Sequence, residues 1–137
     1  MQLISYLNFN GQCETAFKFY EKALGGKISF MSTFAGTPCE SQAPAEWRNK
    51  IMHATLNVGD AILMGSDGMP GQFEAAKGIT VAIVLEDPVE AERIFNALAQ
   101  NGTVQMPIQS TFWAERFGTL VDQFGTPWMV NCGEKKQ

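Results

Sequence analysis

The chain has 137 residues, of which 45% are hydrophobic and 18% charged, a composition typical of a globular protein with one hydrophobic core. Ten basic residues are outnumbered by fourteen acidic ones, which excludes a nucleic-acid platform because phosphate contacts need clustered Lys and Arg. No apolar run approaches the roughly 18 residues of a membrane span and no basic, apolar leader opens the sequence, so we expect a cytoplasmic protein without a membrane partner.

The first half of the chain predicts one strand, one helix and three further strands in that order. A strand is expected at 4–9, and Asn10-Gly11 ends it and begins a helix whose apolar positions recur at steps of three and four. Gly25-Gly26 ends this helix, because glycine tolerates the positive φ of a C-cap. Three more strands follow at 27–34, 51–58 and 61–65, the last two joined by the turn Gly59-Asp60.

The second half repeats this order. A strand is expected at 79–85, and Asp87 as N-cap with Pro88 at the first helical position begins a second helix, which Asn101-Gly102 ends. The two helix ends fall about 76 residues apart, which indicates an internal duplication. Three strands complete the repeat at 103–109, 117–122 and 126–131.

We therefore predict an α+β fold in which two paired βαβββ modules, at 1–67 and 78–132, form a single domain over residues 1–137. One amphipathic helix cannot cover both faces of a module's sheet, so the modules should pair into a curved eight-stranded sheet with the helices outside. The concave inner face would then form a ligand-sized cleft. The loops at 35–49 and 66–78 are expected to shape its mouth.

The three cysteines, Cys13, Cys39 and Cys132, are odd in number and lack the C-x-x-C spacing of a zinc site. They predict neither a disulfide framework nor a structural metal site. We expect buried or incidental thiols, and Cys13 fits the apolar stripe of the first helix.

Five short segments, taken together, point to a known family. They are Tyr6-Leu7-Asn8-Phe9-Asn10-Gly11, Ala16-Phe17-Lys18-Phe19-Tyr20, Lys50-Ile51-Met52-His53-Ala54, Thr111-Phe112-Trp113 and Phe124-Gly125-Thr126-Pro127-Trp128-Met129. Their combination resembles the PhnB-like branch of the vicinal oxygen chelate superfamily, which has the glyoxalase and bleomycin-resistance fold. The resemblance implies the paired βαβββ fold and a homodimer. It fixes no reaction, because the superfamily includes isomerases, dioxygenases, metal-dependent resistance enzymes and proteins that only sequester a ligand.

The resemblance also places a metal site, since metal-binding members take ligands from the first and fourth strands of each module. In this chain those positions are Ser5, Met64, Thr80 and Met129. Neutral hydroxyls and thioethers do not compensate the charge of a divalent ion, so we predict no metal. We also predict no cofactor. Members of this branch are sometimes labelled ubiquinone-pathway methyltransferases, but the chain lacks a glycine-rich loop between a strand and a helix that could cradle a nucleotide-like cofactor.

Strand alternation predicts which side chains line the cleft. His53, the only histidine, should face it and is a weak candidate for a general base or a ligand contact; the alternative is a histidine satisfied by a strand neighbour or a dimer contact. Trp113 could stack on a flat ligand or pack in the core or an interface. The predicted floor is apolar and polarizable, which favours a hydrophobic or aromatic ligand, and consists of Leu7, Phe9, Met64, Ala82, Val84 and Met129.

The leading interpretation is a metal-independent protein of this superfamily that binds a small, partly apolar molecule in the cleft between the modules, with no reaction assigned. One alternative is a metal-dependent lyase, isomerase or dioxygenase whose ligands come from elsewhere, such as His53 with Glu115. Another is a drug-sequestering resistance protein, for which a cationic drug would need an acidic lining that the predicted cleft lacks.

Overall fold

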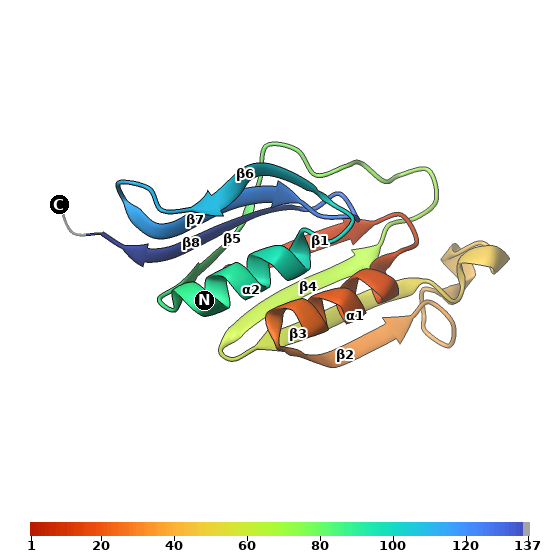
Figure 1. The fold of residues 1–137 in the computed structure, drawn as a ribbon. Coiled ribbons are helices and arrows are strands. Elements are labelled where there is room, and N and C mark those ends of the chain that lie inside the picture. Colours follow the sequence, from red (N-terminus) through yellow and green to blue (C-terminus); the bar gives the residue numbers. More distant parts are fainter. Residues whose placement is uncertain (136–137) are drawn as a thin grey trace. The chain divides into compact units, whose positions relative to one another are not determined.

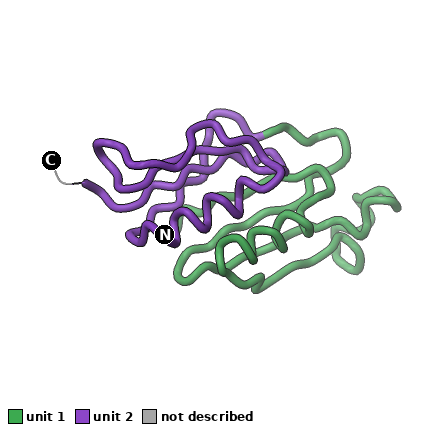
Figure 2. The backbone as a smooth tube through the Cα atoms, viewed as in Figure 1, with its two compact units in different colours: residues 1–75 green, residues 76–137 purple. Residues whose placement is uncertain are grey.

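The structure is a computed structural model in which residues 1–135 are described. The chain consists of two compact units, Met1–Ala75 and Ala76–Gln137, whose helices and strands are labelled in Figure 1 and which are coloured separately in Figure 2. The boundary falls within the linker expected between the two modules. No helix in the described part of the chain is long and apolar enough to span a membrane.

Unit 1 consists of a four-stranded sheet with one helix on one of its faces (Figure 1). The strands are in the order β1-β4-β3-β2, with β1 parallel to β4 and the other pairs antiparallel. Its elements are β1 (Ser5–Phe9), α1 (Cys13–Leu24), β2 (Lys27–Thr33), β3 (Ile51–Val58) and β4 (Ala61–Asp67), with the short 3-10 helices Glu40–Gln42 and Ala45–Trp47 between β2 and β3.

Unit 2 repeats this topology, with strands in the order β5-β8-β7-β6 and β5 parallel to β8. Asp87 caps its helix by accepting a hydrogen bond of 3.0 Å from the backbone N–H of Val89, as the sequence predicted. Its elements are β5 (Val81–Leu85), α2 (Pro88–Leu98), β6 (Thr103–Gln109), β7 (Ala114–Val121) and β8 (Pro127–Glu134).

The α+β class and the βαβββ order of both halves are confirmed. Several details differ from the prediction, among them β4 and β8, which end at Asp67 and Glu134 where the sequence predicted ends at 65 and 131. Backbone pairing joins the strands into two four-stranded sheets, one in each unit, where the sequence predicted one sheet of eight strands. β7 begins at Ala114 rather than at 117, because the Thr111 hydroxyl accepts from the N–H of Ala114 at 3.0 Å and orders the chain before the expected start.

The connection between β2 and β3, expected as an irregular loop, is fixed to the start of α1. The indole Nε1–H of Trp47 donates to the carbonyl of Gly68 at 2.9 Å, and the ammonium of Lys50 donates to the carbonyl of Gly11 at 3.1 Å. Lys50 also lies over the Trp47 ring, 5.8 Å from its centroid. These contacts join three segments that are far apart in the sequence.

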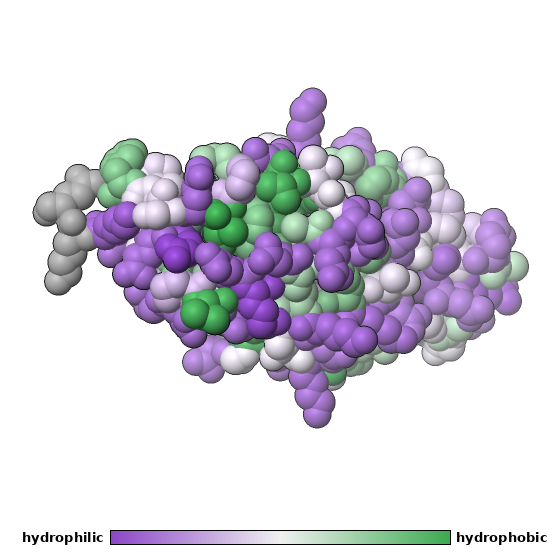
Figure 3. All heavy atoms as spheres, in the orientation of Figure 1, coloured by the Kyte–Doolittle hydropathy of each residue, from purple (hydrophilic) through white to green (hydrophobic). Residues whose placement is uncertain are grey.

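Each helix covers its sheet with aromatic and aliphatic side chains. In unit 1, Phe17 and Tyr20 are fully buried and contact Phe9 of β1, with ring centroids 6.1 and 6.5 Å apart. The outer side of α1 is polar, with Lys18 donating to Glu14 at 2.8 Å. Figure 3, in the orientation of Figure 1, shows hydrophilic residues prevailing over unit 1.

The two sheets share one register, which allows their positions to be matched. Tyr6 of β1 and Thr55 of β3 both pair with Met64 of β4. In unit 2, Ala82 and Thr119 both pair with Met129. One irregularity also matches, since β2 gains one residue between Ile28 and Phe30 and β6 gains one between Val104 and Met106. The duplication read from the sequence therefore extends to individual residue pairs.

Candidate functional site

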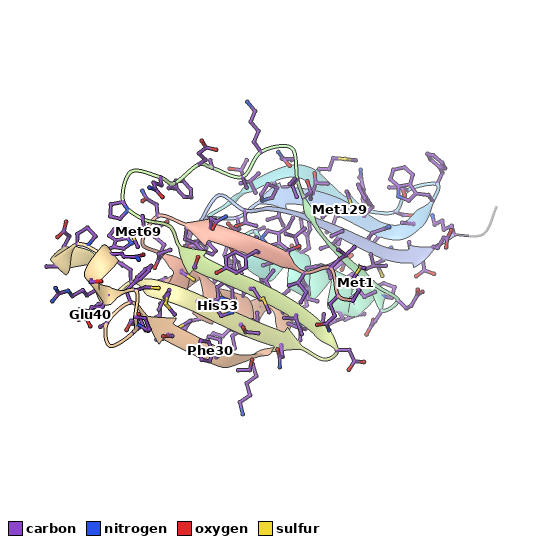
Figure 4. The ribbon with its side chains drawn as sticks, turned by 180° about the vertical axis from the view of Figure 1, so that it is seen from behind. Met1, Phe30, Glu40, His53, Met69 and Met129 are labelled. Carbon is purple, nitrogen blue, oxygen red and sulfur yellow. The ribbon has the colours of Figure 1, made fainter. Side chains whose placement is uncertain are left out.

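The face of the unit 1 sheet away from α1 carries a mixed polar and aromatic surface, which we call the open face. Figure 4 views the molecule from behind, with the labelled side chains of His53 and Phe30 on β3 and β2. The strand registers place on this face Tyr6, Asn8, Lys27, Phe30, Ser32, His53, Thr55, Asn57, Ile62, Met64 and Ser66.

His53 is the centre of a hydrogen-bonded group on the open face. Its Nδ1 lies 3.1 Å from the hydroxyl of Tyr6, and its Nε2 lies 3.2 Å from the hydroxyl of Thr55. Its ring centroid lies 5.7 Å from that of Tyr6 and 5.9 Å from that of Phe30. Together with Met64, which pairs with both Tyr6 and Thr55, these residues form what we call the His53 cluster.

The cluster is accessible from solvent. Tyr6 and Phe30 keep 44% and 51% of their surface exposed, while His53, Thr55 and Met64 are half-buried. Exposed aromatic rings and a thioether next to hydroxyl and imidazole groups provide both apolar contact area and hydrogen bonds. Such a combination is typical of sites for small organic molecules.

Two hydrogen bonds link the side chains of Tyr6, His53 and Thr55 in series, and the donor and acceptor of each bond can be exchanged. A neutral imidazole donates from one nitrogen and accepts at the other. If Nδ1 accepts from Tyr6, then Nε2 donates to Thr55, and the Thr55 hydroxyl proton is free for a ligand; in the opposite tautomer the Tyr6 proton is free. In each case the cluster offers a ligand one hydroxyl donor and one oxygen acceptor.

The register reverses the orientation predicted for three residues of β1. Ser5, Leu7 and Phe9 pair with β4 positions on the α1 side, and Phe9 is 2% exposed against the rings of α1. The alternation was readable, because Asn8 is the polar residue between apolar Leu7 and Phe9. Tyr6 takes the place expected for Ser5, and Tyr6 and Phe30 are the cluster residues that sequence reasoning missed.

The same reversal separates the predicted ligand quartet. Ser5 and Met64 lie on opposite faces of the unit 1 sheet and cannot share a ligand. In unit 2, Ala82 and Met129 pair directly on the face away from α2, and Thr80 precedes β5. Across residues 1–135, nowhere do three His, Cys, Asp or Glu side chains gather closely enough to hold a metal ion.

Trp113 and Trp128 of unit 2 pack on opposite faces of their sheet. Trp113 packs edge-on against Phe117 and Phe112, with ring centroids 5.1 and 4.8 Å apart, and Phe117 lies on the face of Met129. Trp128 points the other way, is 1% exposed, and donates from Nε1 to Asp122 at 2.8 Å. Trp128 and Met129 therefore lie on opposite faces of the unit 2 sheet.

One buried carboxylate, missed by sequence reasoning as an organising residue, shapes unit 1. Asp67 is 2% exposed and accepts three backbone N–H groups, from Gly11 at 2.8 Å, Cys13 at 3.0 Å and Ile51 at 2.8 Å. It thereby fixes the beginnings of α1 and β3 to the end of β4. No sequence signal distinguishes this residue from an aspartate that ends a strand.

The strand-to-helix connections do not fit a nucleotide-like cofactor. The backbone N–H groups that would face an anionic group at the N-terminus of α1, those of Gly11 and Cys13, already donate to Asp67. At the start of α2, the N–H of Val89 donates to Asp87. Both helix starts thus carry a carboxylate of the protein itself, which would repel a phosphate.

The buried thiols are poor nucleophiles. Burial raises the pKa of the Cys13 thiol, and the carboxylates of Asp67 and Glu14 raise it further. Burial likewise raises the pKa of Cys132. Because the thiolate is the reactive form, neither residue is suited to covalent chemistry at neutral pH.

Comparison with known proteins places the chain among close relatives. Residues 1–131 match the family described as 3-demethylubiquinone-9 3-methyltransferase. The protein YjdN of Escherichia coli is 34% identical over 139 residues, covering 96% of this chain and 95% of the relative. The crystal structure of protein PA1353 from Pseudomonas aeruginosa is 46% identical, with a TM-score of 0.89 and coverage of 98% and 99%.

More distant structures share the fold. The PhnB protein from Bacillus cereus is 23% identical, with a TM-score of 0.79 over 96% of this chain and 99% of that one. A glyoxalase/bleomycin resistance protein/dioxygenase family enzyme from Burkholderia phytofirmans is 12% identical, with a TM-score of 0.62 over 95% and 96%. Together these comparisons agree with the resemblance carried by the five sequence segments.

Proposed function

The chain belongs to the 3-demethylubiquinone-9 3-methyltransferase family, a PhnB-like branch of the glyoxalase and bleomycin-resistance superfamily, and from that premise we propose that unit 1 binds a small, partly apolar molecule over the His53 cluster without a metal. The observation that carries the proposal is the geometry of the only histidine. Both of its ring nitrogens are held by hydroxyl groups, next to exposed aromatic rings.

A ligand on this surface would use two kinds of contact. Its apolar part would lie against Phe30 and Met64, where aromatic and thioether groups provide polarizable contact area. Its polar part would form hydrogen bonds with the hydroxyl groups of Tyr6 and Thr55, one of which is free to donate and the other to accept. A site with apolar contacts and a few convergent polar groups selects a ligand by shape and by the position of one polar group.

Metal independence is supported by how His53 is engaged. An ion could bind the imidazole only by displacing the hydroxyl of Tyr6 or of Thr55. No carboxylate or thiol on the same strand face could join it as a second charged ligand. We likewise propose no methyl transfer, because the sequence lacks a glycine-rich loop between a strand and a helix that could cradle a nucleotide-like cofactor.

The proposal is tested with the methionine methyl groups as reporters. Protein labelled with 13C at the methionine methyls is titrated with benzoate, benzamide and benzylamine, which share a ring and differ in charge. We expect at least one probe to shift the methyl resonance of Met64 while that of Met129, its equivalent in unit 2, stays unchanged, both with and without EDTA. If none of the three shifts Met64, or if a shift requires added metal, the proposal is wrong.

As the state of assembly we propose a homodimer. The support is the large apolar side chains exposed in unit 2, namely Ile79 at 76%, Val84 at 71% and Phe112 at 76%. Light scattering on the purified chain distinguishes a dimer of twice 15.1 kDa from a monomer.

A further inference from the structure

The open face of unit 1 is free of carboxylates, although the chain as a whole is acidic. The net charge is −4, yet none of the open-face positions of β1, β2, β3 and β4 is Asp or Glu. The nearest acidic residue along β4, Asp67, points to the α1 side, where it holds backbone N–H groups. Figure 4 places Glu40 in the connection at the end of the sheet, away from His53.

The polar groups of this face are hydrogen-bond donors or can become donors. Hydroxyls of Tyr6 and Thr55 flank the imidazole of His53, and the amide of Asn57 follows on the same strand face. Lys27 pairs with Asn57 at the far end of the sheet, out of reach of a ligand at His53. Hydrogen-bond donors without a competing carboxylate favour an anionic partner, because hydrogen bonds to an ionised acceptor are about twice as strong as neutral ones.

Protonation of His53 would strengthen this preference. An imidazolium donates from both nitrogens, so Nδ1–H would be directed to the Tyr6 oxygen and Nε2–H to the Thr55 oxygen. Both hydroxyl protons would then be free to point at a ligand, where the neutral ring frees only one. The charged and titratable groups on the elements around His53 are Tyr6 on β1 and Lys27 on β2, while the open face of β4 contributes none.

We infer that the ligand of the His53 cluster is a small organic anion, a carboxylate-like group on an aromatic or apolar body, and that it binds together with a proton taken up by His53. The inference rests on the proposed binding function and adds its charge and its pH dependence. The anionic group would accept from the hydroxyls of Tyr6 and Thr55, and the body would contact Phe30 and Met64.

The test compares the three probes at two pH values, with the Met64 methyl as reporter. At pH 6 we expect benzoate to bind about tenfold more tightly than neutral benzamide, and cationic benzylamine more weakly than both. At pH 8, where protons are scarcer, we expect the advantage of benzoate to shrink to about threefold or less. Equal affinities for the three probes, or an advantage of benzoate unchanged between pH 6 and 8, would overturn the inference.

Two variants separate His53 from other causes. In His53→Gln the amide keeps hydrogen-bonding capacity but cannot be protonated, so the advantage of benzoate should become independent of pH. In Lys27→Ala both the advantage of benzoate and its pH dependence should persist. Lys27 pairs with Asn57, which lies four residues, or roughly 13 Å, along β3 from His53. A pH dependence that survives His53→Gln, or one that is lost in Lys27→Ala, contradicts the role given to His53.

The failures of the two proposals are distinguishable. If Met64 responds to the probes without regard to their charge, the binding function stands and the anion preference is wrong. If Met64 responds to none of them, the binding function itself is wrong.

Discussion

The open face of unit 1 differs from the matching face of unit 2 at three of the five cluster positions. Thr55 and Met64 have identical counterparts in Thr119 and Met129. Tyr6, His53 and Phe30 of unit 1 correspond, in that order, to Ala82, Phe117 and Met106 of unit 2. The register that supports the cluster is thus present twice, and the imidazole with its tyrosine partner is present once. At these matched positions, only unit 1 therefore has a hydrogen-bonded imidazole.

In each unit a phenylalanine ring of the helix packs against a glycine of the sheet, but the glycine lies on a different strand. In unit 1 the ring of Phe17 lies over Gly65 of β4, where an added Cβ would come within 2.8 Å of it. In unit 2 the ring of Phe95 lies over Gly118 of β7, where an added Cβ would come within 2.7 Å. The register matches Gly65 with Val130 of unit 2, so the glycine that admits the ring has changed strand.

The largest loss of stability is expected when Gly65 of unit 1 is replaced by valine, the residue at the matching position 130 of unit 2. Gly65→Val places a branched side chain against both the Phe17 ring and the carbonyl oxygen of Leu7, which lies 2.8 Å from an added Cβ. We expect a loss of about 3 kcal/mol in the free energy of unfolding, measured by urea denaturation. The control Gly68→Ala meets only an atom 4.0 Å away and should cost less than about 0.5 kcal/mol. Equal stabilities of the two variants would show that the ring does not require the glycine.

The buried thiol of unit 1 should make stability fall at alkaline pH. Burial and the nearby Asp67 raise the pKa of Cys13 above its ordinary value of 9.0, so above that pH the unfolded chain loses a proton that the folded chain keeps. The contribution is fully present below pH 9 and decreases as the pH rises, by up to about 1.4 kcal/mol at pH 10 relative to pH 8. Urea denaturation of the wild type and of Cys13→Ala at both pH values isolates it. A wild type and a variant that lose the same stability between these pH values would contradict the assignment.

Converting the centre of the cluster to its unit 2 counterpart should weaken binding and leave the fold intact. His53→Phe removes both hydrogen bonds of the imidazole and keeps a flat ring of similar size. We expect benzoate to bind about fivefold more weakly at pH 6, or about 1 kcal/mol, by the shift of the Met64 methyl. The reverse change in unit 2, Phe117→His, is the matched control and should not alter the response of Met64. Unchanged binding in His53→Phe would show that the imidazole does not contribute to binding benzoate.

The fold could be predicted almost completely because its signals are local. The N-cap at Asp87, the turn at Gly59-Asp60 and the helical spacing of apolar residues each depend on a few neighbouring positions, and all three are present in the structure. The predicted start of β7 and the predicted end of β4 were less accurate, because hydrogen bonds to residues outside these strands determine where they begin and end. The hydroxyl of Thr111 orders the start of β7, and the carboxylate of Asp67, at the end of β4, is tied to α1 and β3.

The candidate site was predicted less well because it depends on which face each strand presents. Alternation within β3 puts His53 and Thr55 on one face, and the structure has them there. In β1 the family resemblance placed Ser5 in the cleft, although the polar residue Asn8 marks the other alternation, and a shift of one residue exchanges every side chain between the faces. Tyr6 was missed for this reason. Phe30 was missed because the extra residue at Ser29 reverses the alternation of β2, which no local pattern announces.

The smallest expected effect tests whether the shared threonine differs between the units. In unit 1 the hydroxyl of Thr55 holds Nε2 of His53, whereas in unit 2 the neighbour of Thr119 on the same strand face is Phe117, which has no polar atom to hold. Thr55→Val should therefore weaken benzoate binding about threefold, near 0.6 kcal/mol, because one imidazole nitrogen loses its partner and the ring loses its orientation. Thr119→Val, with the same loss of a hydroxyl at the matching register position, should leave the response of Met64 within experimental error. If both variants weaken binding alike, the hydroxyl acts through the stability of the sheet, and the difference between the two open faces would reside in Tyr6 and His53 alone.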